Sequence, residues 1–250
     1  MEALLESLGL AQSLELLSLT PPGWGGNLLR GLVHSLQIAL GAFGFGLIIG
    51  LFGAYGKLYG GPVTRDLLAI YTTVMRAVPE LVLILILYYV GTDLINQAAQ
   101  AMGYGRVEIS GVVAGIWVLG IVQGAYATEV LRGAIQAVPS GQIEAARSFG
   151  MPPFKLMRRV TIPAMMSFAT PGLANLWLIA TKDTALLAIV GFSELTLETR
   201  QAAASTRAYF TFFLAAGALY LIVTLCSGVV FGRIEKWARR GQPSLKGASR

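Results

Sequence analysis

Long, nearly uncharged apolar segments are the feature that most restricts how this chain can fold. The five longest lie at roughly Leu28–Tyr55, Leu67–Val90, Gly111–Val130, Ala164–Val190 and Tyr209–Phe231. A helix needs about 18–20 apolar residues to cross the ~30 Å hydrocarbon layer of a bilayer, and each segment reaches that length. The alternation of apolar and polar residues that marks a membrane β-barrel is absent. The sequence therefore predicts an all-α, polytopic membrane bundle of about five transmembrane helices.

Composition excludes several other classes of protein. Only 13% of the 250 residues are charged, about half the share of a typical soluble domain. A single cysteine, Cys226, and a single histidine, His34, leave no internal disulfide and no metal-ligand cluster. We therefore expect no metal site and no cofactor bound by this chain, and too little reactive chemistry for an enzyme.

Lys and Arg residues are distributed unevenly between the two ends of the predicted spans. With the ends assigned alternately, thirteen of the 19 basic residues fall on one side, four on the other, and two within the spans. Cytoplasmic loops carry the basic excess, so the thirteen-residue side is predicted to be cytoplasmic, with the N-terminus outside and the C-terminus inside. This bias explains the net charge of +6 without nucleic acid.

The same orientation predicts three regions. Residues 1–27 lack a secretory signal and are expected to form a periplasmic or interfacial segment. Residues 28–232 would form the transmembrane domain, and residues 233–250 a basic cytoplasmic tail.

A polar segment at about residues 136–163 joins the third and fourth spans on the predicted cytoplasmic side. Polar capping residues precede a run of helix formers, which indicates a short helix beginning near Gly141. Gly150 stands where a helix commonly ends in a left-handed residue, and two prolines then prevent continuation. A second short helical piece should precede Pro163, which opens the fourth span.

The first of these short helices is amphipathic. Ile143, Ala146 and Phe149 are expected on one side of it. One interpretation is an interfacial helix that lies on lipid headgroups, helped by the basic residues of 155–159. The other is a compact knob outside the bilayer that contacts a partner.

Glu144-Ala145-Ala146, followed by Gly150 and Pro163, resembles the EAA signature of permease subunits of bacterial ABC importers. Further segments resemble the polar-amino-acid branch of that family: Arg76–Glu80, Gly124–Gly133 and Thr181–Leu186. Together the similar segments span roughly residues 28–232. The subgroup that the chain resembles comprises the histidine, arginine, ornithine and opine permeases.

The resemblance implies a subunit of an ATP-driven importer in a bacterial inner membrane, moving polar and in particular basic amino acids or opines. In such importers the EAA loop docks onto a dimer of separate ATP-binding subunits, a second permease completes the pathway, and a periplasmic binding protein delivers the substrate. The implied coupling residues are Gly141, Glu144, Ala145, Ala146, Gly150 and Pro163. The chain contains no G-x-x-x-x-G-K-[ST] phosphate loop, so ATP and Mg are expected on the partner ATPase.

Four charges lie within the second and fourth predicted spans. Arg76 and Glu80 are four residues apart and are expected to share a helix face, while Lys182 and Asp183 interrupt the fourth span. Charges at bilayer depth are costly and usually face the bundle interior. They could form a structural salt-bridge cluster, or a gate or shallow substrate site between two permeases, with the carboxylates meeting a cationic group. The residues of this second interpretation are Arg76, Pro79, Glu80, Lys182, Asp183 and Thr184.

The same charges also allow a different class of transporter. A secondary transporter or channel driven by an ion gradient could use Arg76, Glu80 and Asp183 as a proton or cation relay. Five spans with no visible inverted repeat argue against that class. Whether uptake depends on ATP or on an ion gradient would separate the two.

Two further patterns predict contacts at the inner halves of the spans. Small residues four apart indicate close helix packing: Gly46 with Gly50, and Gly120 with Gly124. Glu129 and Arg132 are three apart at the inner end of the third span and predict an ion pair that positions the following loop.

Overall fold

The computed structural model describes residues 14–240, and these residues form helices joined by short connections, with no strand among them. The predictions for residues 1–13 and 241–250 lie outside the described residues. Five helical segments are long and apolar enough to cross a membrane: Gly25–Tyr59, Glu80–Ala101, Gly111–Gln136, Pro153–Val190 and Tyr209–Ala238. The predicted polytopic helical fold is confirmed.

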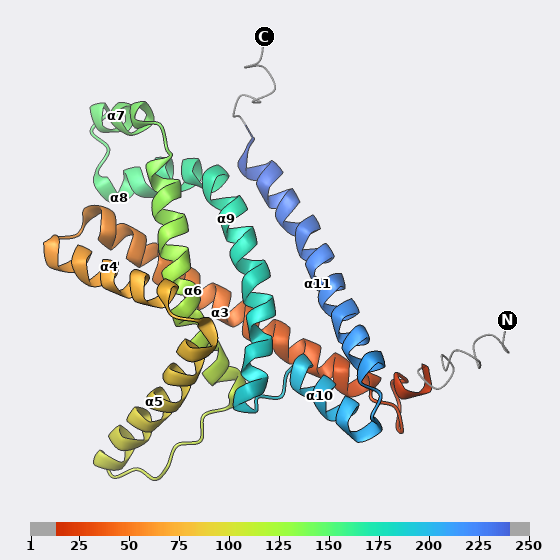
Figure 1. The fold of residues 1–250 in the computed structure, drawn as a ribbon. Coiled ribbons are helices and arrows are strands. Elements are labelled where there is room, and N and C mark those ends of the chain that lie inside the picture. Colours follow the sequence, from red (N-terminus) through yellow and green to blue (C-terminus); the bar gives the residue numbers. More distant parts are fainter. Residues whose placement is uncertain (1–13, 241–250) are drawn as a thin grey trace.

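The helices differ widely in length. Their bounds are α3 (Gly25–Tyr59), α4 (Pro62–Ala77), α5 (Glu80–Ala101), α6 (Gly111–Gln136), α7 (Ser140–Ser148), α8 (Pro153–Leu156), α9 (Ile162–Asp183), α10 (Leu195–Thr206) and α11 (Tyr209–Ala238). A π-helical turn, Met157–Thr161, leads into α9, and a 3-10 helix, Thr184–Val190, follows it. In Figure 1, α3 crosses α6 and α9, α7 lies at one end of the bundle, and α10 lies at the other end.

Small residues allow α3 and α6 to approach closely. A Cβ added at Gly50 would lie 2.5 Å from the Cβ of Ala127, and one at Gly46 would lie 3.0 Å from the Cβ of Gln123. On the facing helix, a Cβ at Gly124 would lie 2.7 Å from Ile49. The prediction that these glycines serve helix packing is confirmed.

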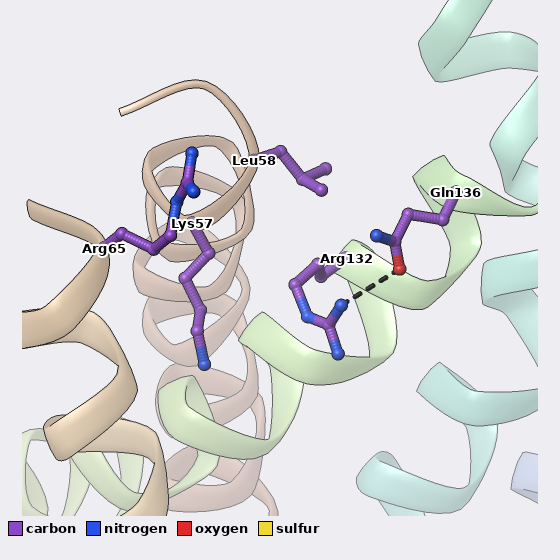
Figure 2. A pocket seen from close by; sticks show the side chains of 5 residues that line it. All are labelled: Lys57, Leu58, Arg65, Arg132 and Gln136. Atoms are coloured by element: carbon purple, nitrogen blue, oxygen red, sulfur yellow. Dashed lines mark hydrogen bonds between the residues drawn. The ribbon is translucent and has the colours of Figure 1, made fainter. Parts of the chain in front are cut away.

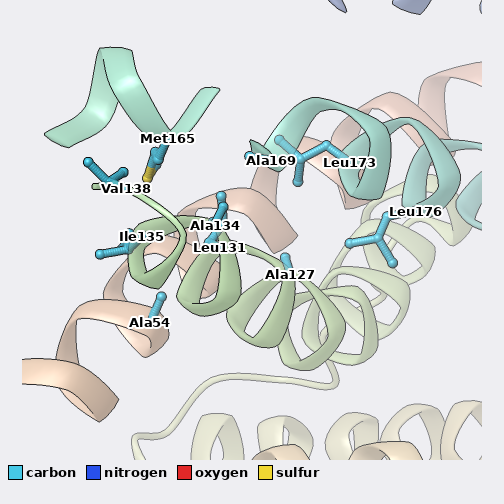
Figure 3. Packing of buried hydrophobic residues seen from close by; sticks show 10 residues of the cluster. All are labelled: Ala54, Ala127, Leu131, Ala134, Ile135, Val138, Met165, Ala169, Leu173 and Leu176. Carbon is cyan, nitrogen blue, oxygen red and sulfur yellow. The ribbon is translucent and has the colours of Figure 1, made fainter. Parts of the chain in front are cut away.

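A buried apolar cluster joins α3, α6 and α9 near the end that carries α7 (Figure 3). Its residues are Ala54, Ala127, Leu131, Ala134, Ile135, Val138, Met165, Ala169, Leu173 and Leu176. Val138 and Met165 lie on either side of the α7–α8 loop, so the cluster fixes both ends of that loop to the same rigid core.

The predicted span Leu67–Val90 is wrong, because the chain breaks at Val78–Pro79. Val78 is extended, with ψ 139°, as expected for a residue before proline. Pro79 offers no N–H to continue the α4 ladder, so a new helix begins at Glu80. Figure 1 shows α4 and α5 meeting at an angle. Only α5 meets the length and hydropathy of a spanning helix.

The fourth span changes its helix type near its end. α9 continues through Pro171 and ends at Asp183, where the 3-10 helix begins. Gly191 then turns the chain with a φ of +87° and leads to α10. The sequence analysis did not anticipate α10, because this short helix is neither long nor uniformly apolar.

Candidate coupling loop and translocation site

The C-terminus of α7 is closed by a Schellman turn. Gly150 has a φ of +70°, its N–H donates to the Arg147 carbonyl at 2.8 Å, and the Met151 N–H donates to the Ala146 carbonyl at 3.2 Å. This pairing satisfies carbonyls that the end of a helix would otherwise leave free. The predicted helix end at Gly150 is confirmed.

α7 presents one face to the bundle and one to the outside. Ala146 is buried, and Ile143 packs against the buried cluster of α3, α6 and α9. Gly141, Glu144 and Ala145 are exposed. The EAA segment therefore anchors the loop with its second alanine and leaves the glutamate and the first alanine accessible.

Phe149 does not pack beside Ile143 and Ala146, so that expectation is wrong. α7 ends at Ser148, and the capping geometry at Phe149 takes its side chain out of the helical periodicity. Phe149 is 90% exposed, and Phe154, which the sequence analysis did not single out, is 79% exposed. Two large aromatic side chains thus stand on the outer surface of the loop.

The second part of the loop returns the chain to the bundle. α8 and the π-helical turn bury Leu156 and Thr161 and run directly into α9. Pro163 lies in the first turn of α9, directly after the π-helical turn. The prediction that Pro163 opens the fourth span is wrong, because the continuous helical segment already begins at Pro153.

An ion triad ties the end of α6 to α3. Glu129 accepts from Arg132 at 2.8 and 3.0 Å, as predicted, and also from Lys57 at 2.5 Å. Lys57 donates in addition to the Thr72 hydroxyl of α4 at 2.8 Å. The sequence analysis missed Lys57 and Thr72 because both lie on other helices.

The charges within the spans do not form the salt-bridge cluster that one interpretation predicted. Within residues 14–240 neither Arg76 nor Lys182 has a carboxylate within 4.0 Å, and both are exposed. Since the chain breaks at Pro79, Arg76 ends α4 whereas Glu80 begins α5, and the two residues share no helix face.

The two carboxylates instead lie together. Glu80 is half-buried and Asp183 is 9% exposed, and their side chains are close enough to interact. Thr184 is also buried, but its hydroxyl donates to the Thr181 carbonyl at 2.9 Å and interacts with Tyr220, so it belongs to a different polar cluster. Pro79 caps the start of α5 and so fixes where Glu80 begins that helix.

Gln123 and Tyr126 of α6 complete this acceptor-rich site. The buried Gln123 amide donates from Nε2 to Asp183 Oδ2 at 3.1 Å, while its Oε1 is buried with no hydrogen-bond partner among residues 14–240. The Tyr126 hydroxyl interacts with Glu80. The sequence analysis missed both residues, although an amide in the middle of an apolar span was a usable signal.

A second buried polar cluster lies at the α10 end. Glu194 is fully buried, caps α10 by accepting from the Leu197 N–H at 2.7 Å, and accepts from Ser35 at 3.2 Å and Tyr220 at 3.4 Å. It thereby joins α3, α10 and α11. Burial raises the pKa of Glu194 above its ordinary value, against the lowering effect of the hydrogen bonds from Thr196, Leu197 and Ser35.

A polytopic helical bundle with an exposed amphipathic loop and a polar site among its spans defines a membrane transport component. The family described as binding-protein-dependent transport system inner membrane component matches residues 46–240. The chain belongs to this family, and the predicted resemblance to importer permeases is confirmed.

Relatives of known function agree with this assignment. The chain is 41% identical to the nopaline transport system permease protein NocQ of Agrobacterium fabrum, over 91% of this chain and 98% of that protein. It is 39% identical to the histidine/lysine/arginine/ornithine transport system permease protein HisQ of Escherichia coli, over 86% and 94%.

Solved structures show the same fold. A structure described as an amino acid ABC transporter with histidines superposes with a TM-score of 0.71 at 30% identity, over 85% of this chain and 94% of that one. The MetNI methionine ABC transporter superposes with a TM-score of 0.69 at 20% identity, over 85% and 96%. The second likeness concerns the fold alone.

Proposed function

We propose that this permease moves cationic amino acids or opines through an ATP-driven importer, and that the acceptor-rich site contacts their cationic group. The observation that carries this proposal is the pair of carboxylates, Glu80 and Asp183, beside the unpartnered Oε1 of Gln123. Carboxylate and amide oxygens accept hydrogen bonds from guanidinium and ammonium groups. Two adjacent carboxylates also repel each other, and a cation between them relieves that repulsion.

The names of the relatives support this choice of substrate. Nopaline, octopine, histidine, lysine, arginine and ornithine are the substrates that those names give. Basic amino acids carry nitrogen-bound protons that match the acceptors around Asp183.

The loop that contains α7 would couple the permease to a dimer of ATP-binding subunits. Large apolar side chains on a surface outside the membrane commonly mark a protein interface, and Phe149 and Phe154 are such side chains. Glu144 and Ala145 are accessible on the adjoining face. ATP and Mg would bind to those partner subunits, because the chain has no phosphate loop. With the N-terminus outside, as the distribution of Lys and Arg predicts, α7 would be cytoplasmic and α10 would face the periplasmic binding protein.

A second permease, identical or similar, would cover the face that carries Arg76 and Lys182. Both charged side chains are exposed on this protomer, and neither is ion-paired within residues 14–240. Hydrocarbon does not accommodate such groups, whereas a protein interface or a polar pathway does. The acceptor-rich site would then lie near the junction of the two permeases in the bacterial inner membrane.

Uptake of arginine into vesicles tests this function. We would reconstitute the chain with the ATP-binding subunit, second permease and binding protein of its own system. We expect uptake to require ATP and to persist when ionophores abolish the proton and sodium gradients. Asp183→Asn should lower uptake about tenfold or more, because a hydrogen bond to a charged group contributes about 1.5–3 kcal/mol.

Asp93→Asn provides the matched control for that substitution. Asp93 lies on α5, is exposed, and accepts from Gln97 at 2.7 Å, away from the acceptor-rich site. Its replacement should leave uptake unchanged. Unchanged uptake in both Asp183→Asn and Glu80→Gln would remove the site from the mechanism, and uptake that follows the ion gradient would support the secondary-transporter alternative.

A further inference from the structure

A cationic pocket lies between the α7-side ends of three helices, apart from the acceptor-rich site. It has a volume of about 380 Å³ and is lined by Lys57 and Leu58 of α3, Arg65 of α4, and Arg132 and Gln136 of α6. Figure 2 shows Lys57 and Arg65 on one side of the pocket and Arg132 with Gln136 on the other. We propose that this pocket binds the phosphate group of an anionic phospholipid.

Positive charge exceeds negative charge in this pocket. The three cations are Lys57, Arg65 and Arg132, and in the described part of the chain the one carboxylate bonded to them is Glu129, which pairs with Lys57 and Arg132. Within residues 14–240 the side chain of Arg65 has no hydrogen bond or ion pair. An excess of cations in a concave site favours an anionic ligand.

Hydrogen-bond donors remain available on the same three side chains. Lys57 has three donors and uses two of them, on Thr72 and Glu129. Arg132 has five donors and uses three, on Glu129 and Gln136. Together with the fork of Arg65 these donors suit the several acceptor oxygens of a phosphate group.

Neighbouring side chains place the pocket at the depth of lipid headgroups. Tyr55 and Tyr59 precede and follow Lys57 on α3, are exposed, and have ring centroids 4.8 Å apart. Tyrosine is enriched at membrane–water interfaces. Phe52 on α3 and Leu67 on α4 are exposed apolar side chains of the same helix pair, as expected where acyl chains surround it. Basic pockets between helices at this level suit acidic headgroups.

Lipid-dependent stability of the purified full-length chain in a neutral detergent tests this site. Phosphatidylglycerol should raise the melting temperature more than phosphatidylcholine or inorganic phosphate at matched concentration. Arg65→Gln should raise the phosphatidylglycerol concentration needed for half the effect about fivefold. Arg65→Lys should retain most of the response, and native mass spectrometry should count correspondingly fewer bound phosphatidylglycerol molecules on Arg65→Gln.

Arg158→Gln serves as the control, because Arg158 is an exposed basic residue of the α7–α9 loop outside the pocket. Its lipid response should match that of the natural chain. Equal responses to phosphatidylglycerol and phosphatidylcholine, an equal response to inorganic phosphate, or an unchanged response in Arg65→Gln would each overturn the proposal. Loss of bound phosphatidylglycerol on adding the ATP-binding subunit would also overturn it, because a protein would then occupy the pocket.

Discussion

At the scale of single residues, glycines on α3 have different environments although the sequence makes them look alike. Gly50 faces Ala127 of α6, with no room for a Cβ, whereas Gly44 has nothing within 4 Å of the position that its Cβ would occupy. The first glycine therefore serves helix contact, and the second only adds conformational freedom.

Gly50→Ala should destabilise the chain by about 1–3 kcal/mol, because the added methyl group forces α3 away from α6. Gly44→Ala should instead be neutral or stabilise by about 0.5–1 kcal/mol through its helix propensity. Thermal unfolding of the two variants in the same detergent makes the comparison. Equal losses of stability would show that the contact between α3 and α6 is looser than described.

Glu194 is a fully buried acid outside the spans, and its burial changes its pKa. Its carboxyl lies among Ser35 of α3, Leu197 of α10 and Tyr220 of α11, and His34 of α3 bonds to the neighbouring carbonyl of Ser193 at 3.0 Å. Burial raises the pKa of Glu194, so folding favours the protonated carboxyl. The stability that this group contributes is therefore present at low pH and declines as pH rises through the raised pKa.

The melting temperature of the natural chain, relative to that of Glu194→Gln, should fall by a few degrees as pH rises from about 5 to 8. Glutamine keeps an acceptor oxygen for the Leu197 N–H but cannot ionise. Glu235→Gln is the control, since Glu235 forms an exposed pair with Arg239 on the surface of α11 and such pairs contribute little. Parallel curves for the natural chain and Glu194→Gln would contradict this explanation.

At the scale of elements, α7 is a short helix whose end depends on one residue. Gly150 has a φ of +70°. In this conformation the N–H groups of Gly150 and Met151 donate to the carbonyls of Arg147 and Ala146 and close the turn. An L-residue in that conformation costs about 1–2 kcal/mol. The turn also directs Phe149 outward, so the geometry of the exposed face follows from the glycine.

Gly150→Ala should fray the end of α7 and lower the substrate transported per ATP hydrolysed several-fold, while the spans keep their thermal stability. Gly133→Ala on α6 is the control, because a Cβ there meets nothing within 4 Å and its φ is not positive. Transport and ATP hydrolysis are measured on the same vesicles. Unimpaired coupling in Gly150→Ala would mean that the loop does not transmit the ATPase cycle.

At the scale of the whole molecule, the described chain leaves both charged side chains and broad apolar surface uncovered. α11 packs mainly against α9 and α10 and is otherwise largely exposed. Arg76 at the end of α4 and Lys182 near the end of α9 are exposed charges. These two features support an assembly in which another permease covers the charged face while lipid covers apolar surface.

A cysteine at Lys182 should cross-link to the second permease in the assembled transporter. Because Cys226 is exposed, we would introduce Lys182→Cys into a Cys226→Ser background and add a short bismaleimide after introducing one cysteine into the partner. A band at the combined mass of two permeases is expected. Phe52→Cys, on the exposed apolar face of α3, should give little of this cross-linked product. More cross-linked product from Phe52→Cys than from Lys182→Cys would place the interface on α3.

Much of the fold and part of the site were predictable because they depend on local chemistry. Runs of apolar residues placed four of the five spans, and Gly150 marked the end of α7. The break at Pro79 was missed because the apolar run continued across it. The hydropathy of that run outweighed the backbone chemistry of one proline.

The sequence by itself determined that this chain is a polytopic membrane protein with a polar loop between two spans, since hydropathy and turn chemistry act over a few neighbouring residues. Only the tertiary structure decided which polar groups meet: Gln123 with Asp183, Lys57 with Glu129, and Ser35 with Glu194. These partners lie 60, 72 and 159 residues apart along the chain. Such contacts depend on where two helices cross, and that position is set by the packing of their small residues.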